Sequence, residues 1–483
     1  MTAPPDTLSA TDPPPAMARP ALMTLAQACA LRNDEVAALF KAHLSPAQYG
    51  LFRLLGFHRI TISRAEGMYY YDQNGRAIMD FFGGFGSLAL GHNHPRILAA
   101  RRTFQDEKRH EIAIAFMSQY AATLAHNLAQ IAPGDLDHVF LATAGSEAVE
   151  YALKLAEKVQ GPARCRIACA ENAFHGKTRG SLSVTDSPLY RDRFTLLETT
   201  VKLPFGDIGA LRRAFEADPA IGILILETIQ GGAGIVTADA DYWREVRALC
   251  DRHEVIWIAD EVQCGVGRTG RFFAFEHMGV VPDIVTLAKS LGGGKAAVGA
   301  VISRKPLFMQ AYGASKTAII HAQATFGGMG ESSATAIEAL NVLYDEDLIA
   351  NAARQGALLL SELNRLAAKY PAMIKEIRGE GLMVGIEFHD FSRTMPFGLR
   401  RILSMADDRL KGSLCGFVGA LLLRDHDILV AFTEFNRNVI RLEPPLIVTE
   451  DEVRRFIAAL DALLGRGVTA IATRYVKAFV SPA

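Results

Sequence analysis

The chain has 483 residues, of which half are hydrophobic and 21% are charged, and its formal net charge is −1. This balance is typical of a globular protein with two or three domains and excludes a largely disordered chain. The near-neutral charge gives no reason to expect nucleic acid or an anionic membrane as a partner, because both select basic surfaces.

Six cysteines in so long a chain do not indicate a disulfide framework. Cys165 and Cys169 have neither a second cysteine pair nor clustered histidines, so we expect buried strand residues and no metal site. The N-terminus lacks the pattern of a secretory signal, and the chain has no run of about 18 apolar residues. We therefore expect a cytoplasmic protein without a membrane span.

Taken in chain order, residues 1–20 are rich in proline and small residues and predict a disordered tail. The stretch from Asn33 to Phe57 has a helical pattern, with Asn33 or Asp34 as its cap. Residues 69–80 predict a β-hairpin, because two strand-like runs flank an Asn74–Gly75 turn.

From about residue 95 to 335, apolar strand runs alternate with helical stretches. This alternation predicts an α/β fold with a large central, mostly parallel sheet that helices cover on both faces. After residue 335 the chain turns to long helices and then to mixed α+β segments. We therefore expect a large domain over residues 96–335, and a smaller α+β domain built from residues 21–95 and 336–483. The predicted strands are 139–143, 166–169, 221–226, 255–259, 284–288 and 298–302.

Two motifs at predicted strand ends suit an anionic and a cationic group. Gly145 and Ser146 follow a strand and open a helix, where free backbone N–H groups and the helix dipole attract a phosphate; an ordinary serine cap is the alternative. Asp260 ends an apolar strand, and a buried carboxylate needs a cationic partner. A protonated pyridine nitrogen or a structural salt bridge would supply that charge.

Lys289 follows the strand run 284–288 and precedes three glycines. A desolvated lysine has a lowered pKa and presents a neutral amine that attacks carbonyl carbon, although most lysines in such places are solvated loop residues. Phe174, just after a strand, suits stacking on a flat heterocycle. Arg441 lies within an apolar run and requires an anion, either a substrate carboxylate or a structural acid.

Gly265–Gly270 matches the G-x-G-x-x-G pattern of dinucleotide sites. The residues after it do not open a helix as that site requires. We therefore expect a loop beside Asp260, and a nicotinamide oxidoreductase is a minor alternative.

In this order and spacing the motifs resemble the class III (ornithine/putrescine-type) aminotransferases of the aspartate-aminotransferase fold. The resemblance runs from about Gly67 to about Glu450. Its matching segments are 82–86, 91–95, 145–147, 174–176, 227–231, 260–263, 267–270, Lys289, 325–328, 378–383 and 440–441.

The resemblance implies a ping-pong transfer of an amino group from an amine or ω-amino donor to a 2-oxo acid, with pyridoxal 5'-phosphate as cofactor. It identifies Lys289 as the Schiff-base lysine, Asp260 as the partner of the pyridine nitrogen, and Arg441 as the ligand of the α-carboxylate. It also implies a homodimer, because Thr325 matches a phosphate contact from the neighbouring subunit. The implied cofactor-binding residues, all within the predicted large domain, are Gly145, Ser146, Phe174, His175, Asp260, Val262, Gln263, Lys289 and Thr325.

Two departures concern the substrate. The family motif Glu-Pro-Val/Ile-Gln-Gly-Glu has Thr228 and Gly232 here, and the second glutamate is the residue that pairs with the arginine in ornithine-type members. We therefore expect Arg441 to lack this partner, the pocket to gain room, and the donor to be bulkier or more apolar than ornithine. The expected substrate residues are Phe85, Glu227, Gly232 and Arg441, with Leu88 beside them.

The second departure is an extra helical segment over residues 397–425, which would either border the substrate entrance or, more commonly, pack in the small domain; a membrane-surface helix is a remote third option. The fold also serves racemases, aminomutases and decarboxylases, which Arg441 does not exclude. A catalytically inactive binding protein is a further alternative, against which the intact Lys289, Asp260 and Ser146 argue.

Overall fold

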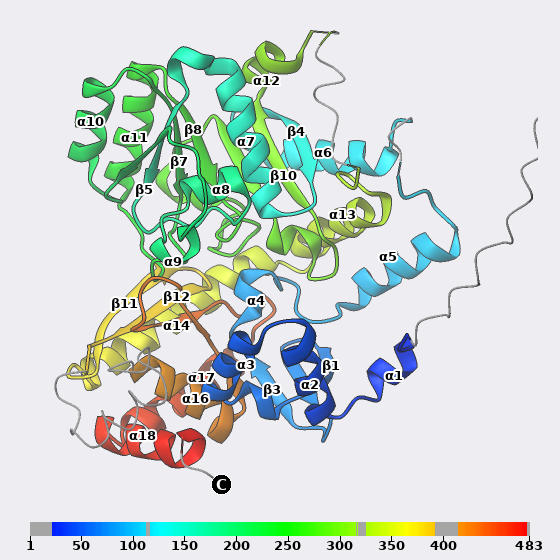
Figure 1. Cartoon of the computed structure of the whole chain (residues 1–483), viewed down its shortest axis with the longest axis vertical. Coiled ribbons are helices and arrows are strands. Elements are labelled where there is room, and N and C mark those ends of the chain that lie inside the picture. Colours follow the sequence, from blue (N-terminus) through cyan, green and yellow to red (C-terminus); the bar gives the residue numbers. More distant parts are fainter. Residues whose placement is uncertain (1–21, 113–115, 315, 317–324, 392–413, 481–483) are drawn as a thin grey trace, which may run out of the picture.

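The computed structural model describes residues 22–112, 116–314, 316, 325–391 and 414–480. The predicted tail over residues 1–20 and the part of the extra segment before residue 414 lie outside the described residues. Figure 1 shows two halves: an upper one built on a large sheet, and a lower one in which the first and last parts of the chain lie together.

The upper half contains a seven-stranded sheet with the order β4-β10-β9-β8-β7-β5-β6. The strands from β9 to β6 are all parallel, whereas β10 is antiparallel to both of its neighbours. The predicted mostly parallel sheet is therefore confirmed. The strands are β4 (Leu136–Ala142), β5 (Arg166–Ala170), β6 (Thr200–Leu203), β7 (Ile221–Glu227), β8 (Ile256–Asp260), β9 (Ile284–Leu287) and β10 (Gly299–Arg304).

Strand β7 shows why the central strands are apolar along their whole length. All seven of its residues are buried, and alternate side chains point to opposite faces of the sheet. Ile223 and Ile225 pack with helix α7 (Gly145–Gln160), whereas Leu224 and Leu226 pack with helix α11 (Ala240–His253). Helices thus cover both faces, as predicted.

The remaining helices of the upper half flank this sheet or lead into it (Figure 1). They are α5 (Pro95–Asp106), α6 (Gln119–Ile131), α8 (Arg179–Val184), α9 (Pro188–Arg191), α10 (Ile208–Ala217), α12 (Lys305–Tyr312) and α13 (Gly330–Asp345), with short 3-10 turns η2 (Pro162–Arg164), η3 (Ala274–Met278) and η4 (Lys289–Gly292).

The lower half contains two four-stranded sheets, β1-β2-β3-β13 and β11-β12-β15-β14. The predicted hairpin is confirmed, because β2 and β3 pair antiparallel. Strand β13 pairs parallel with β3, so Ile428 lies opposite Met79 and joins the two ends of the chain in one sheet. The strands are β1 (Ile62–Glu66), β2 (Tyr69–Asp72), β3 (Ala77–Asp80), β11 (Ile374–Glu380), β12 (Met383–Phe388), β13 (Ile428–Leu429), β14 (Ala431–Phe432) and β15 (Val439–Leu442).

The helical pattern predicted from Asn33 to Phe57 forms two helices, because Ser45 caps a new helix whose first residue is Pro46. The domain limits at residues 95 and 335 stay a prediction. The helices of the lower half are α1 (Leu25–Cys29), α2 (Asn33–His43), α3 (Pro46–Leu54), η1 (Phe57–Arg59), α4 (Gly83–Gly86), α14 (Leu348–Lys369), α16 (Leu414–His426), α17 (Glu450–Leu464), α18 (Val468–Tyr475) and η7 (Val476–Val480).

Helix α16 is the described part of the extra segment. Its residues from Leu414 to Leu423 are all buried, and it packs against α17 and α18, so this part of the segment is core packing of the lower half. Among the described residues, no single helix is long and apolar enough to cross a membrane; α17 and α18, bent by 98° at their junction, pass that test only as a pair.

Candidate active site

A cavity of about 480 Å³ lies where β7, β8 and β9 end. The strand register places Glu227, Asp260 and Thr286 side by side at this edge, and the chain reaches Lys289 two residues after β9 ends. Glu227, Asp260 and Lys289 line the cavity. The carboxyl edge of a parallel sheet is the usual ligand-binding edge of such folds, so the topology itself gathers these groups.

Asp260 is held by three hydrogen bonds and is only 4% exposed. Its Oδ2 lies 2.7 Å from His175 Nδ1, and its Oδ1 accepts from Thr286 Oγ1 at 3.0 Å and from the Val262 N–H at 3.1 Å. These contacts fix the Asp260 carboxyl group at the wall of the cavity. His175 and Thr286 therefore act as positioning residues for Asp260.

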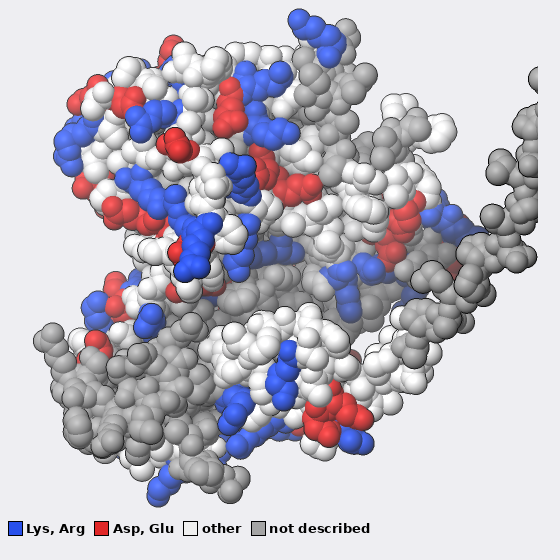
Figure 2. Space-filling view, viewed as in Figure 1, with Lys and Arg blue, Asp and Glu red and all other residues white. Residues whose placement is uncertain are grey.

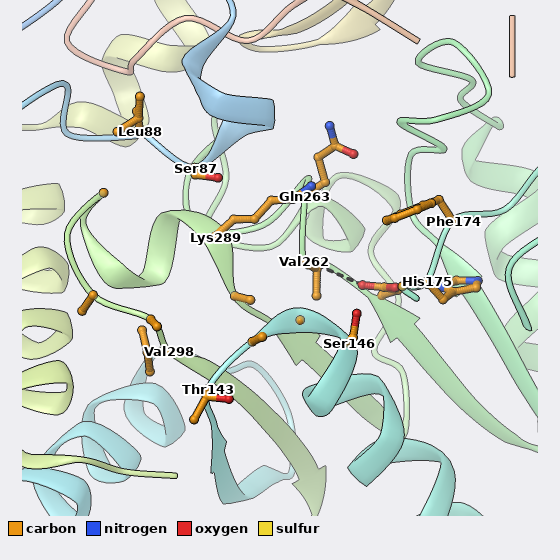
Figure 3. Close-up of a pocket in the computed structure, with 18 of the residues that line it drawn as sticks. Ser87, Leu88, Thr143, Ser146, Phe174, His175, Val262, Gln263, Lys289 and Val298 are labelled. Carbon is orange, nitrogen blue, oxygen red and sulfur yellow. Dashed lines mark hydrogen bonds and ion pairs between the residues drawn. The ribbon is translucent and has the colours of Figure 1, made fainter. Parts of the chain in front are cut away.

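Lys289 extends into the cavity from the start of η4, toward Gln263 (Figure 3). Its backbone has φ +46°, a left-handed conformation that costs a non-glycine residue free energy and is often found at functional sites. Burial lowers the pKa of Lys289, and the charge of Arg441 lowers it further against the opposing carboxylates. The side chain thus has the properties of a nucleophilic amine.

Helix α7 begins at the opposite wall of the cavity with Gly145 and Ser146 (Figure 3). A Cβ at Gly145 would lie 2.8 Å from Val262 Cγ1, and a Cβ at Gly176, whose φ is +132°, would clash with Ser146 Oγ. Both glycines therefore keep the helix N-terminus open. Free backbone N–H groups and the helix dipole make this end an anion site, with the Ser146 hydroxyl as a further donor.

Phe174 and Val262 line the cavity between these two ends, as Figure 3 shows, and Gln263 lies at its far side. The Gln263 amide donates to both Glu443 carboxylate oxygens at 2.9 Å. The structure thus brings together eight of the nine predicted cofactor-binding residues around one cavity. Thr325 is exposed and does not line it, so its role stays a prediction.

Arg441 is almost fully buried in β15. It lacks the second glutamate of the family motif, as expected, but it has two other carboxylate partners that were not expected. Its Nε lies 3.3 Å from Glu443 Oε2, and its Nη2 lies 3.5 Å from Glu434 Oε1. The guanidinium also lies over the Phe85 ring, 4.6 Å from its centroid. Two carboxylates from the C-terminal part of the chain therefore take the place of the second glutamate of the family motif, whose position Gly232 occupies.

The expectation that Gly232 enlarges the pocket is wrong. A Cβ there would lie 2.9 Å from the Phe435 ring and 3.4 Å from Phe174 Cβ, so Phe435 already occupies the space. Gly232 does not line the cavity, nor do Phe85 and Arg441, whereas Glu227 and Leu88 do.

Two buried glutamates lie beside the site. Burial raises the pKa of Glu227 to about 7, although its carboxylate accepts the Phe174 N–H at 2.8 Å. Burial likewise raises the pKa of Glu261 to about 7. Thr228, which departs from the family motif, donates to Glu261 at 2.5 Å and so satisfies that carboxyl group.

The Gly265–Gly270 loop forms turns followed by the 3-10 turn η3, without the α-helix that a dinucleotide site requires. Its Arg268 is fully buried and donates to the carbonyl of Pro444, which ties the upper half to the lower half. Among the described residues, no group of three or more His, Cys, Asp or Glu is placed to hold a metal ion.

Thr286, Glu434 and Glu443 contact site residues but were not predicted from the sequence. The position of Glu443 could have been used, because it is two residues after Arg441 and side chains two apart on an extended chain point to the same face. Glu434 lies in a connecting segment without a motif, so nothing in the sequence pointed to it.

The family model "Aminotransferase class-III" matches residues 56–464. The chain belongs to the class III aminotransferases. It is 35% identical over 435 residues to a putrescine aminotransferase from Pectobacterium atrosepticum, covering 88% of this chain and 87% of that one. It is also 35% identical over 425 residues to the aminotransferase PigE of Serratia sp., covering 82% of this chain but about half (49%) of that longer protein.

Solved structures agree with this family. An ornithine aminotransferase from Toxoplasma gondii has a TM-score of 0.77 and 29% identity, covering 90% of this chain and 96% of that one. An (S)-enantioselective omega-transaminase from Thermomicrobium roseum has a TM-score of 0.78 and 27% identity, with coverages of 90% and 99%. The predicted family and fold are confirmed.

Class III aminotransferases depend on pyridoxal 5'-phosphate (PLP), and another Toxoplasma gondii ornithine aminotransferase structure is described with PLP at its active site. The residues of this cavity fit that group. The open N-terminus of α7 suits the phosphate, the walls at Phe174 and Val262 suit a flat ring, and the buried Asp260 carboxylate suits a protonated ring nitrogen.

Proposed function

We propose that this aminotransferase moves an amino group from an amine or ω-amino donor to a 2-oxo acid, in two half-reactions that use one cavity. The observation that carries the proposal is the convergence of Lys289, Asp260 and the N-terminus of α7 on that cavity. When bound, PLP supplies an electron-withdrawing ring that stabilises negative charge on the substrate carbon.

The chain's own groups divide the remaining work. Lys289, whose pKa is lowered by burial, provides the Nζ that attacks carbonyl carbon and accepts and returns a proton. Asp260, fixed by His175 and Thr286, keeps the ring nitrogen protonated. The fork of Arg441 binds the carboxylate of the 2-oxo acid.

Glu434 adapts this site to two substrates of different charge. Its side chain is 24% exposed, in contrast to the fully buried Glu443, so it is the Arg441 partner that is free to move. While a donor without a carboxylate is bound, Glu434 neutralises Arg441. When a 2-oxo acid binds, its carboxylate displaces Glu434.

The test is an absorbance titration of the purified protein. PLP should give a visible absorbance band that Lys289→Ala abolishes and that Lys305→Ala, on an exposed part of α12, retains. Amine donors should bleach the band, and pyruvate or 2-oxoglutarate should restore it. Turnover of the donor without any 2-oxo acid would instead identify a racemase or decarboxylase, and absence of the band would favour a binding protein.

We also propose a homodimer with shared active sites. The exposure of Thr325 supports this proposal. Three apolar side chains are also exposed: Phe326, next to Thr325, is 57% exposed, and Phe116 and Met117 are 82% and 98% exposed. Light scattering should give twice the monomer mass. Mixing Lys289→Ala with Thr325→Glu should restore about a quarter of the wild-type activity, since each mixed dimer regains one complete site. No recovery would show that each subunit works alone.

A further inference from the structure

A second, larger cavity lies in the lower half beside the active site. Its volume is about 750 Å³. Helix α3, the β2–β3 hairpin and the segment from β13 to β14 form its walls, and most of its lining is aliphatic or aromatic. Representative lining residues are Leu55, Phe57, Ile60, Ile78, Val430 and Phe432.

One end of this cavity adjoins the catalytic groups. Glu434, its only charged lining residue among those described, pairs with Arg441, and Phe85, also in its lining, stacks under the same guanidinium. Tyr190 lines the second cavity, and its ring lies 6.0 Å from that of Phe174, which lines the first cavity. The charge of Glu434 also acts on Lys289. Phe85, Tyr190 and Glu434 of the second cavity therefore lie next to Arg441 and Phe174 of the active site, and no described residue lines both cavities.

The charges at this boundary are compensated. Arg441 is paired with Glu434 and Glu443 and is covered by the Phe85 ring, so it does not present a free cation to a chain passing from one cavity to the other. Beyond Glu434 the described part of the wall offers no charged group. A second ammonium or carboxylate placed there would lose its hydration without a partner, whereas a hydrocarbon chain would gain by leaving water.

We infer that the second cavity binds the hydrocarbon chain of an amine donor whose amino group reaches Lys289. The substrate class is primary amines that carry an unbranched alkyl chain. This inference rests on the proposed function and adds to it the chemistry of the donor. It gives the expected apolar donor a binding site, at a place other than Gly232.

The first test is a series of ethylamine, butylamine, hexylamine and octylamine, with pyruvate as acceptor and the enzyme loaded with PLP. Each buried methylene contributes about 0.8 kcal/mol, so kcat/KM should rise about fourfold per methylene until the cavity is filled. A flat series, in an enzyme with a normal PLP band and measurable turnover, overturns the inference and leaves the proposed function standing.

Two matched variants locate the effect. Leu51 lines the cavity from α3 and is 39% exposed, whereas Leu39 on α2 is 38% exposed and does not line it. Leu51→Trp should flatten the dependence on chain length, and Leu39→Trp should retain it. Equal behaviour of the two variants overturns the inference.

Calorimetry with 1-octanol on the PLP-free protein provides a readout that needs no catalysis. Wild type and Leu39→Trp should bind it, and Leu51→Trp should bind it at least tenfold more weakly. If no PLP band forms, the proposed function fails, and octanol binding alone then decides whether the second cavity binds a hydrocarbon chain. Absence of octanol binding overturns the inference, and it is the result expected if a segment of a second copy fills the cavity.

Discussion

Gly176→Ala tests the predicted anion site at α7 most directly. The added Cβ would clash with Ser146 Oγ, so the hydroxyl has to leave its position at the helix N-terminus. A hydrogen bond to a charged group contributes about 1.5–3 kcal/mol, which corresponds to about 10- to 150-fold weaker PLP binding. The substitution also places alanine at φ +132°, which costs about 1–3 kcal/mol of stability in its own right.

Gly206→Ala separates these two effects. Gly206 has φ +82°, and a Cβ there would meet nothing within 4 Å, so alanine adds backbone strain without a clash. Thermal unfolding of the PLP-free proteins should show both variants destabilised, while titration with PLP should show weaker binding only for Gly176→Ala. Unchanged PLP affinity in a folded Gly176→Ala protein, or an equal loss in Gly206→Ala, would refute the placement of the phosphate.

Three further predictions concern Glu227, Glu434 and Thr286. The pKa of Glu227 is raised to about 7 in the folded protein, so its contribution to stability is complete below its unfolded pKa and is lost as pH rises to about 7. In chemical unfolding of the PLP-free proteins, the stability of the wild type relative to Glu227→Gln should therefore fall by on the order of 3 kcal/mol between about pH 4.5 and 7. A difference in stability that does not change with pH would contradict this prediction. Glu434→Gln should lower KM for the 2-oxo acid by about two- to fivefold and raise it for amines that carry no carboxylate, because a partly exposed ion pair contributes up to about 1 kcal/mol. A parallel change for both substrates would remove Glu434 from the proposed role. Thr286→Val should cost about 1 kcal/mol of stability and slow the amine half-reaction measured at the PLP band, whereas loss of stability alone would make Thr286 merely structural.

The sequence patterns predicted the large sheet because its central strands are continuous apolar runs between helices. Strand β6 was not predicted, since Thr200–Leu203 is a short run that includes a lysine at the sheet edge, where partial exposure is tolerated. The β2–β3 hairpin was predicted because the Asn74–Gly75 turn is a local signal.

In the site, Lys289, Asp260 and Ser146 were predictable because each lies at or just after the end of a strand, and these strands end at the same edge of the sheet. The surroundings of Arg441 were not. Glu434 and Phe435 reach the site from a connecting segment of the lower half, and no periodicity relates that segment to Gly232. Sequence reasoning therefore identified the chemical groups but not the residues that fill and neutralise the space around them.

The parallel pairing of β13 with β3 has a consequence for biosynthesis. Met79 and Ile428 lie opposite each other but are roughly 350 residues apart in the chain. At about 5–20 residues per second, a ribosome needs about 20–70 s to reach the second strand after making the first. During that interval the apolar edge of β3 has no partner, so the N-terminal hairpin is the segment most exposed to aggregation and the one on which a chaperone has the longest time to act.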